Sequence, residues 1–432
     1  MLYLKNGYLI DPASGEEGCR NILIDEEKGI IQRIVTPQEG SEEIKETPDI
    51  TVIDLKGQTV TPGLVDVHVH FRDPGFTYKE DIETGARAAA KGGFTSVVMM
   101  ANTRPPIDST ETLSYVLEKG KTTGIHVYSC ANVTKGMAGK ELTDMEALCK
   151  AGAVGFTDDG IPLMDEQLLQ KALQKAAALN RPISLHEENP AFIGNNGINA
   201  GEVAVHFGIE GSPREAEIFM VERDLEIALK EEADLSIQHI STKEAVDLVR
   251  QAKKKSEHIY AEATPHHFTL TQEAVRRHGT LAKMNPPLRL EEDRLAIIQG
   301  LQDGTIDMIA TDHAPHSREE KEKPLTQAPS GIIGLELSLS LGIRELVKKG
   351  YLTMMELIQK MSLAPAKLYH LNAGYLAEGG PADLVVFDAA REWIAGEYVS
   401  KASNTPFTGE RMPGVVAYTI CNGRIVYRKD ER

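Results

Sequence analysis

Six side chains of types that bind metal ions recur along the chain, each close to a short apolar run. They are His68, His70, Asp159, His186, His239 and Asp312. Imidazole and carboxylate groups are common ligands of Zn²⁺. Four imidazoles and two carboxylates are enough to hold two such ions and still leave coordination positions open for water or substrate. The sequence therefore predicts a two-metal site assembled from distant segments.

The first two histidines are separated by one residue, in the segment Asp66-Val-His68-Val-His70. On a strand, residues i and i+2 point to the same side, so both imidazoles can contact one ion. Taken alone, two histidines on a half-buried strand are equally compatible with a structural role. The other candidate ligands favour metal binding, with a carboxylate or carbonyl orienting each ring.

Asp158 and Asp159 follow another apolar run and offer adjacent carboxylates. Because strand side chains alternate, only one of the two faces the site. We predict that Asp159 bridges two ions, since no lysine ends this run to supply a bridge, and that Asp158 has a local role in a turn or cap. His186 and His239 each end a further run and together form a natural ligand set for a second ion, although either alone could be a core histidine.

Asp312 begins the segment Asp312-His313-Ala-Pro-His316 and is the candidate general acid and base. A metal pair lowers the pKa of bound water towards neutrality. A carboxylate beside it can take the proton and return it to a leaving nitrogen. We expect His316 to touch substrate and His313 to be structural, while His266 and His267 keep a smaller chance of contacting substrate or metal.

Acidic residues outnumber basic ones, 64 to 47, for a net charge of −17. This disfavours binding to nucleic acid or anionic membranes, and an anionic substrate would need fixed local cations. Arg72, two residues beyond His70, can fork a carboxylate, with a surface salt bridge as the alternative. Asn102 can donate amide hydrogens to the same group. Asn285 is a further candidate for polar substrate groups, with an Asn-Pro turn as the alternative.

Eight apolar runs alternate with helical stretches over residues 59–371, which is typical of an α/β protein with a (β/α)₈ TIM-type barrel. The expected strands are residues 59–65, 95–100, 125–129, 153–156, 183–185, 235–237, 259–262 and 306–310. The six candidate ligands follow the first, fourth, fifth, sixth and eighth of them. That is the end of the barrel where this fold carries its chemistry, and closure of the ring brings residues 68 and 312 together.

The two chain ends differ from this central region. Residues 1–58 and 372–432 contain short β-type segments, and we predict that they form one small β-sandwich domain beside the barrel of residues 59–371. Residues 316–331 are polar and are expected to form a long mobile loop next to the metals. The four cysteines are far apart, no charged n-region precedes an apolar stretch, and no apolar run approaches a membrane span. We therefore expect a cytoplasmic protein without disulfides.

In order and spacing, these motifs resemble the dihydroorotases of the amidohydrolase superfamily, in their long bacterial class. The resemblance covers nearly the whole chain, and its motifs are residues 66–75, 101–103, 157–160, 186–189, 238–242, 285–289 and 312–316. It implies a zinc enzyme of de novo pyrimidine (UMP) biosynthesis. The implied reaction is the reversible cyclisation of N-carbamoyl-L-aspartate to L-dihydroorotate, with a metal-bridging hydroxide and Asp312 as general acid and base.

The resemblance also implies a role for each site residue. One zinc ion is expected on His68, His70 and Asp312, the other on His186 and His239, with Asp159 bridging them. The expected substrate contacts are Arg72, Asn102, Asn285, His316 and the main chain near Gly331. The family commonly has an aromatic residue before this glycine, whereas this chain has Ser330, which leaves the detail of loop closure open.

Two alternatives compete with this reading. Another cyclic-amide hydrolase, such as an allantoinase or hydantoinase, shares the metal core but does not need to grip a carboxylate beside the scissile amide. A catalytically inactive scaffold would lack ligands. Arg72 with Asn102, and the presence of all six ligands, favour the dihydroorotase. We also expect a homo-oligomer, while association with an aspartate transcarbamoylase stays open.

Overall fold

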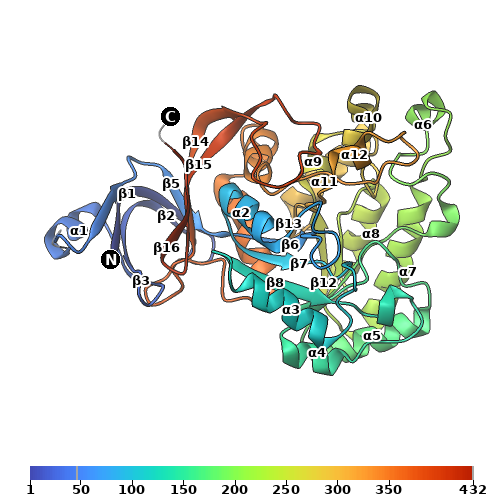
Figure 1. Ribbon diagram of the computed structural model, residues 1–432, viewed down its shortest axis with the longest axis horizontal. Coiled ribbons are helices and arrows are strands. Elements are labelled where there is room, and N and C mark those ends of the chain that lie inside the picture. The colour runs from blue at the N-terminus through green and yellow to red at the C-terminus, as the bar shows by residue number, and fades with distance from the viewer. Residues whose placement is uncertain (45–46, 431–432) are drawn as a thin grey trace.

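The structure is a computed structural model that describes residues 1–44 and 47–430. Within these residues, strands form two eight-stranded sheets. One is a ring of parallel strands, and the other contains strands from both ends of the chain (Figure 1). The two lie side by side in an elongated molecule, with both termini on the side of the second sheet. The predicted fold class is confirmed.

The barrel strands pair in chain order, each parallel to the next. They are β6 (Leu64–Val69), β7 (Phe94–Met99), β8 (His126–Ala131), β9 (Gly155–Phe156), β10 (Ile183–Leu185), β11 (Leu235–Ile237), β12 (Ile259–Ala263) and β13 (Met308–Ile309). The ring closes between its last and first strands through a parallel bridge of Val69 with His313. The Asp66 carboxylate accepts the Thr311 N–H at 3.1 Å across the same seam. Closure therefore brings the segments of the first and last predicted ligands together.

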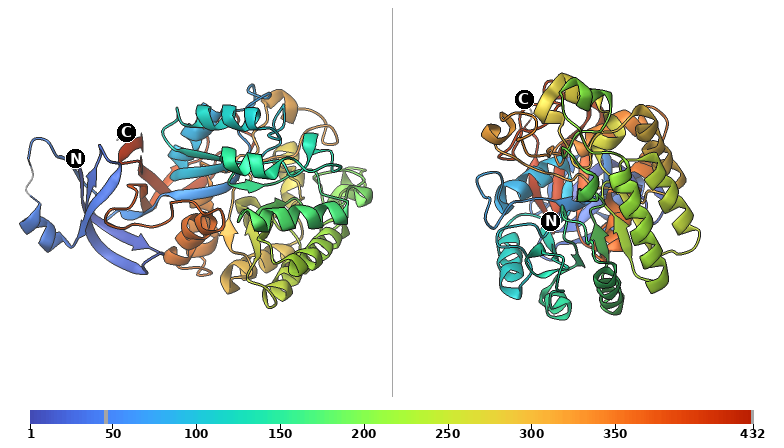
Figure 2. Two further views of the ribbon diagram at one scale, coloured as in Figure 1. Left: turned by 90° about the horizontal axis from the view of Figure 1, so that it is seen from below. Right: turned by 90° about the vertical axis from the view of Figure 1, so that its right-hand side faces the viewer.

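Helices surround the barrel strands, as the end-on view in Figure 2 shows. Their apolar faces pack inward; in α8, Val246 and Val249 are buried on the face that a helical repeat creates. The longer helices are α2 (Ile82–Gly92), α3 (Thr110–Gly120), α4 (Met145–Ala151), α5 (Glu166–Ala178), α7 (Glu215–Glu231), α8 (Lys243–Lys253) and α11 (Glu291–Asp303). Shorter ones are α6 (Glu202–His206), α9 (Pro265–Thr269), α10 (Glu273–His278), α12 (Arg318–Lys321), α13 (Ser338–Gly342), α14 (Met354–Ile358) and α15 (Ala364–Leu368).

The second sheet, called here the terminal sheet, runs in the order β16-β15-β14-β5-β1-β2-β3, with β4 also paired to β1. Its strands are β1 (Leu2–Asp11), β2 (Glu16–Asp25), β3 (Ile30–Val35), β4 (Thr51–Asp54), β5 (Thr59–Pro62), β14 (Leu384–Ile394), β15 (Arg411–Cys421) and β16 (Arg424–Arg428), with α1 (Pro37–Glu43) after β3. Antiparallel pairing of β14 with β5 joins the two chain ends. A separate apolar cluster that includes Leu4, Ile24, Val60 and Val386 forms its core.

The first predicted barrel strand, residues 59–65, was wrong. Thr59–Pro62 belongs to the terminal sheet, and the first barrel strand is Leu64–Val69. The apolar run is continuous, and the chain passes from one sheet to the other with only Gly63 between them, so the two-residue period cannot mark the change. His68 consequently lies within the strand rather than after it. The predicted domain boundaries stay predictions, although strand pairing puts residues 59–62 with the terminal sheet.

The connection between β14 and β15, residues 395–410, leaves the terminal sheet and packs against the barrel. Ser400 donates its hydroxyl to Glu80, and the Val399 N–H donates to Glu336 at 2.9 Å. Further along, Asn404 reaches the chain that follows β13. A segment predicted within the small domain therefore contributes to the mouth of the barrel.

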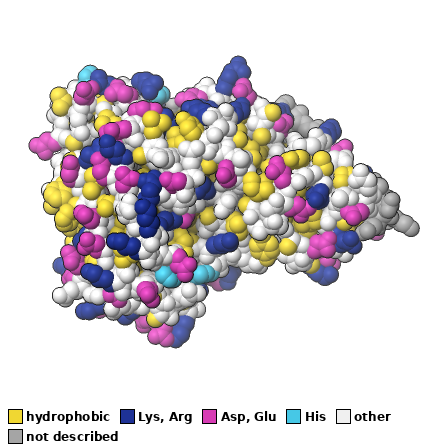
Figure 3. All heavy atoms as spheres, turned by 180° about the vertical axis from the view of Figure 1, so that it is seen from behind, with side chains coloured by type: hydrophobic (Ala, Val, Ile, Leu, Met, Phe, Trp, Pro, Cys, Tyr) yellow, Lys and Arg dark blue, Asp and Glu magenta, His cyan; other side chains and the backbone are white. Residues whose placement is uncertain are grey.

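The surface has no large block of one charge on the face drawn in Figure 3, where acidic and basic side chains are interspersed. Over the described ranges, no helix combines the length and the apolar character needed to cross a membrane.

Candidate active site

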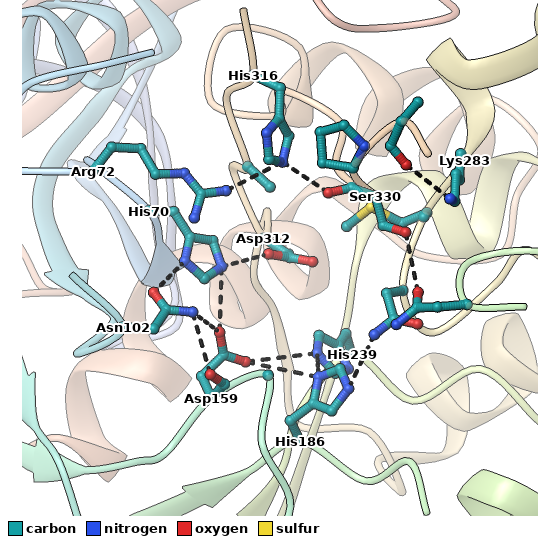
Figure 4. Close-up of a pocket in the computed structure, with 17 residues that line it drawn as sticks. His70, Arg72, Asn102, Asp159, His186, His239, Lys283, Asp312, His316 and Ser330 are labelled. Atoms are coloured by element: carbon teal, nitrogen blue, oxygen red, sulfur yellow. Dashed lines mark hydrogen bonds and ion pairs between the residues drawn. The ribbon is translucent and has the colours of Figure 1, made fainter. Parts of the chain in front are cut away.

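The six predicted ligands converge at the C-terminal ends of the barrel strands, around a pocket of about 380 Å³. Five of them line this pocket, together with the predicted substrate residues Arg72, Asn102, Asn285 and His316. His68 lies beneath it and is fully buried. Figure 4 shows Arg72 and His316 on one side of the cluster, with Asp159, His186 and His239 on the opposite side.

The first group of ligands surrounds one point. Nε2 of His68 lies 3.5 Å from Oδ1 of Asp312 and 3.5 Å from Oδ1 of Asp159. Nε2 of His70 lies 3.0 Å from Oδ1 of Asp312 and 3.5 Å from Oδ2 of Asp159. Two ligands about 2.0–2.1 Å from a tetrahedral ion are separated by roughly 3.4 Å. These spacings fit ligands that share a cation, and buried Nε2 of His68 has no hydrogen-bond partner among the described residues.

The second group is completed by two histidines whose nitrogens face each other. Nδ1 of His186 lies 2.9 Å from Nε2 of His239. These nitrogens lie 3.8 and 3.9 Å from Oδ1 of Asp159. Asp159 thus lies between the two histidine groups, with Oδ2 near His70 and with Oδ1 near His68, His186 and His239. A carboxylate in this position can contact ions on both sides.

The charge states of the candidate ligands differ. Burial alone would raise the pKa of Asp159, but the neighbouring His68 and His70 imidazoles hold it well below its usual range, so the carboxylate is ionised. Burial, reinforced by His186, keeps the pKa of His239 well below its usual range. Burial and the Arg72 charge lower the pKa of His70. Burial opposes protonation of His68 and His186 as well, but the Glu262 carboxylate raises the pKa of His68 well above its usual range and the Glu188 carboxylate raises that of His186. Because neutral imidazole is the form that binds metal, an ion would displace a proton from these two rings.

Carboxylates beside the other ring nitrogen of two ligand histidines orient their rings. Nδ1 of His68 lies 3.2 Å from Oε2 of Glu262, a buried residue of β12. Nε2 of His186 lies 3.3 Å from Oε2 of Glu188. Such carboxylates fix the ring and raise the basicity of the nitrogen that faces the metal. Neither glutamate was predicted from the sequence, although an acid inside the apolar run of residues 259–262 was a signal.

Asn102 also orients ligands. Its Oδ1 lies 3.0 Å from Nδ1 of His70, and its Nδ2 donates to Oδ2 of Asp159 at 3.0 Å and to the carbonyl of Asp159 at 3.2 Å. Both amide hydrogens are therefore engaged by a ligand residue. The predicted contact of Asn102 with substrate stays a prediction, and the described contacts show a role in holding His70 and Asp159.

Three site residues have left-handed backbone conformations. The φ angles of Arg72, His239 and Asp312 are 60°, 31° and 45°. Residues other than glycine rarely adopt this region, and each instance costs on the order of 1–3 kcal/mol. All three lie just after a barrel strand, where the left-handed turn ends the strand and re-aims the side chain. The surrounding barrel must therefore hold this part of the pocket in place.

The loop of residues 316–331, called here the lid, is anchored by lysine side chains that donate hydrogen bonds to its carbonyl groups. Nζ of Lys283 donates to Leu325 and Ala328 at 2.8 and 2.7 Å. Nζ of Lys321 donates to Pro329 and Gly331 at 2.9 and 3.1 Å. The lid contains one short helix, α12, and Lys283 also lines the pocket.

Asn404, from residues 395–410, ties the two ends of the lid. Its Oδ1 accepts the N–H of His316 at 3.0 Å, and its Nδ2 donates to the carbonyls of Ala314 and Gly331 at 2.9 and 3.0 Å. Only 3% of Asn404 is exposed, so few alternative partners are available. No sequence motif distinguished this asparagine.

Comparisons with known proteins agree with this geometry. Residues 59–426 match the model of the Amidohydrolase family. The chain belongs to the amidohydrolase family. Among curated relatives it is 56% identical to the dihydroorotase of Clostridioides difficile strain 630, over 99% of this chain and 100% of the relative. It is 50% identical to the dihydroorotase of Lactococcus lactis strain IL1403, over 99% of each chain. The predicted resemblance is confirmed.

Solved structures of this fold are amidohydrolases named for a related activity. The L-hydantoinase (dihydropyrimidinase) from Arthrobacter aurescens superposes with a TM-score of 0.88 at 25% identity, covering 100% of this chain and 96% of that one. The D-hydantoinase from Thermus sp. gives a TM-score of 0.85 at 23% identity, covering 100% and 97%. The second comparison supports the fold alone.

At the second end of the lid this amidohydrolase has Ser330 before Gly331. The Ser330 hydroxyl donates to Oδ1 of Asn196 at 3.2 Å, and its carbonyl lies 2.8 Å from Nε2 of His316. Gly331 has a φ of 151°, and a Cβ there would lie 2.7 Å from both the Ala314 carbonyl and the His316 ring. This end of the lid therefore requires glycine at position 331. The contact of the Gly331 main chain with substrate stays a prediction.

The remaining candidates have other partners. Asp158 accepts the N–H groups of Val133 and Thr134 at 2.9 and 3.2 Å, a local role as expected. His313 accepts the Gly334 N–H at 3.2 Å. His267 is held between Thr264 and the Pro286 carbonyl, and His266 is buried outside the residues that line the pocket. Nδ2 of Asn285 lies 3.3 Å from Nε2 of His186, at the pocket wall.

Proposed function

We propose that the protein is a dihydroorotase that interconverts N-carbamoyl-L-aspartate and L-dihydroorotate in pyrimidine biosynthesis. The observation that carries the proposal is the position of Arg72 and His316 beside the converged ligand cluster. A cation and an N–H donor there can hold a carboxylate next to the scissile amide. The names of relatives with 50–56% identity over 99% of the chain support the same reaction.

We further propose that two zinc ions complete the site. His68, His70 and Asp312 would hold one ion, His186 and His239 the other, and Asp159 would bridge them. When bound, such a pair polarises a carbonyl group and lowers the pKa of water towards neutrality. Spacings near 3.5 Å and the unpartnered Nε2 of His68 support this assignment.

The chain's own groups would bind the substrate and move the proton. Arg72 and the Nε2–H of His316 would hold the substrate carboxylate, with the Asn285 amide at the pocket wall. In hydrolysis, Asp312 takes a proton from the attacking water and delivers it to the ring nitrogen as the amide C–N bond breaks. The contacts of Asp312 with His68 and His70 use Oδ1, and Oδ2 is the oxygen that would take the proton.

In the direction of ring closure the same carboxyl works in reverse. The ureido nitrogen attacks the side-chain carboxyl carbon and loses a proton, a C–N bond forms, and a C–O bond breaks. Protonated Asp312 supplies a proton to the departing hydroxyl, which leaves as water, and Asp312 is regenerated by the proton from nitrogen. Asp312 can serve both directions because it would reach both the nitrogen and the oxygen between which the proton moves.

Hydantoin hydrolysis is the competing function, favoured by the names of the superposed structures. The decisive experiment compares L-dihydroorotate, hydantoin and allantoin as substrates, with metal content measured on the same sample. We expect kcat/KM for dihydroorotate to exceed the others by on the order of 10²-fold or more. A preference for hydantoin would remove the proposal.

Arg72→Met sharpens this comparison. Loss of a charged carboxylate contact should lower kcat/KM for dihydroorotate by on the order of 10²-fold, mainly through KM. Any hydantoin turnover should change little, because that ring carries no carboxylate. Equal losses on both substrates would assign Arg72 to the general structure of the pocket.

The same proposal extends to cellular context. We propose a cytoplasmic location, because the four cysteines are free thiols and two of them, Cys130 and Cys421, are buried. We propose separately that the protein is a homo-oligomer. Sedimentation of the purified protein, alone and mixed with an aspartate transcarbamoylase, tests the oligomeric state and the open question of that partner. A monomer at all concentrations would contradict the first of these.

A further inference from the structure

The ring of His316 has a second partner that the proposed reaction does not use. Nζ of Lys79, in the segment before α2, lies 3.3 Å from Nδ1 of His316. The same ammonium lies 2.9 Å from Oε1 of Glu320, and the Lys79 side chain is only 12% exposed. Lys79 is not among the residues that line the pocket, so it approaches His316 from the side away from the substrate space.

The partners of the two ring nitrogens determine the tautomer. Nε2 lies 2.8 Å from the carbonyl oxygen of Ser330, which can only accept, and 3.5 Å from Nη2 of Arg72, which can only donate. The much shorter contact with the carbonyl assigns a hydrogen to Nε2. Burial, reinforced by the charges of Arg72 and Lys79, holds the pKa of His316 well below its usual range, so the ring is neutral. Nδ1 must then accept, and the Lys79 ammonium is the donor beside it.

Glu320 could instead favour the other tautomer of His316, with the hydrogen on Nδ1. Its Oε2 lies 3.5 Å from Nδ1 of His316 and could accept a hydrogen from that nitrogen. A neutral ring turned to this tautomer would present the bare lone pair of Nε2 to the Ser330 carbonyl or to a substrate carboxylate, which is repulsive. The Lys79 ammonium both donates to Nδ1 and engages Glu320, and so opposes this tautomer.

We propose that Lys79 is a positioning residue, which locks His316 in the Nε2–H tautomer and directs that N–H towards the space beside Arg72. Nε2 lies 3.5 Å from the Arg72 guanidinium, so the two donors can meet one carboxylate. In the described structure the Ser330 carbonyl takes the place of that acceptor (Figure 4). The identity of the carboxylate as that of dihydroorotate rests on the proposed function; the tautomer does not.

Kinetics test the positioning role. Lys79→Met should raise KM for L-dihydroorotate about tenfold and leave kcat within about twofold, because the lost interaction acts on substrate binding. Lys79→Arg should restore most of the affinity. The matched control is Lys401→Met, since Lys401 donates to the Thr77 carbonyl and to Asp81 in the same segment but does not touch His316. An unchanged KM in Lys79→Met, or an equal rise in the control, overturns the proposal.

A double-mutant cycle separates action through His316 from direct contact with substrate. In a His316→Asn background, Lys79→Met should cause no further rise in KM. If it weakens binding again by the same factor, Lys79 acts on the substrate itself and the proposal is wrong.

The tautomer can be measured without turnover. In protein labelled with ¹⁵N-histidine, the His316 signals are identified by their loss in His316→Asn. We expect the Nε2–H pattern in the wild type and a population of the Nδ1–H form in Lys79→Met. A wild-type Nδ1–H pattern, or a pattern unaffected by Lys79→Met, overturns the inference. Failure of the wild type to hydrolyse dihydroorotate would instead contradict the proposed function.

Discussion

The two sides of the pocket are built differently. On the metal side, the ligands lie on or just after barrel strands, and side chains such as Glu262 and Asn102 orient them. On the lid side, Lys283, Lys321 and Asn404 bind main-chain carbonyls of residues 314–331. The metal side is therefore specified by side-chain chemistry at each position. The lid side depends on a few side-chain donors that fix its backbone path, and two of them, Lys283 and Asn404, lie far from it in the sequence.

This contrast predicts how substitutions divide. Changes on the metal side should remove chemistry or metal and leave substrate affinity largely intact. Changes on the lid side should weaken substrate binding and leave the reacting groups in place. A variant that crosses this division would show that the two sides are coupled.

Asp312→Asn should have the largest effect, because the proposed proton carrier is lost while its shape is kept. We expect kcat to fall by on the order of 10³-fold with KM changed only a few-fold. Steady-state kinetics on L-dihydroorotate, with metal content determined on the same preparation, check this. Retention of near-normal kcat would exclude Asp312 as general acid and base.

Glu262→Gln should come next, since it removes the carboxylate that orients His68. Metal affinity should fall about 10- to 100-fold. Competition against a chelator measures the affinity, and excess zinc should restore activity. If the variant retains metal as the wild type does, the contact at 3.2 Å contributes nothing to ligation.

Asn404→Ala tests the lid. Loss of the bonds to His316 and Gly331 should raise KM about tenfold while kcat and metal content stay near wild type. Ser403→Ala is the matched control, because Ser403 is the exposed neighbour in the same segment. A fall in kcat without a rise in KM would mean that the segment supports the metal side instead.

Lys321→Met should have the smallest effect, a change in how the free energy of unfolding depends on pH. Burial lowers the pKa of Lys321 to about 7, with the Lys283 charge adding to the shift. Between pH 7 and the unfolded pKa near 10.5, the unfolded chain binds more protons than the folded one, so stability rises with pH there. Relative to Lys321→Met, the wild type should gain about 1 kcal/mol in its free energy of unfolding from pH 7 to pH 8. Denaturant unfolding at both values measures this, and parallel curves would place the ammonium in solvent.

The sequence predicts the metal side well because its residues lie in short motifs and on strands whose side chains alternate between two faces. The His68-x-His70 spacing and the strand ends at Asp159 and Asp312 identify side chains that the structure brings together. The boundary at Gly63 between β5 and β6 was not predicted, because one apolar run supplies strands to both sheets. Asn404 was not predicted because its partners are main-chain N–H and carbonyl groups roughly 70–90 residues away, and a main-chain partner leaves no mark in the residue pattern.

The pairing of β5 with β14 has a consequence for synthesis. One edge of β5 is covered early by β1, but its other edge stays open until the ribosome has made Leu384–Ile394. Open strand edges are templates for aggregation. A chain released before that point would therefore be prone to aggregate. It would also lack Asn404, which holds the two ends of the lid. Nascent chains of this protein should accordingly depend on chaperone protection until Leu384–Ile394 has been made.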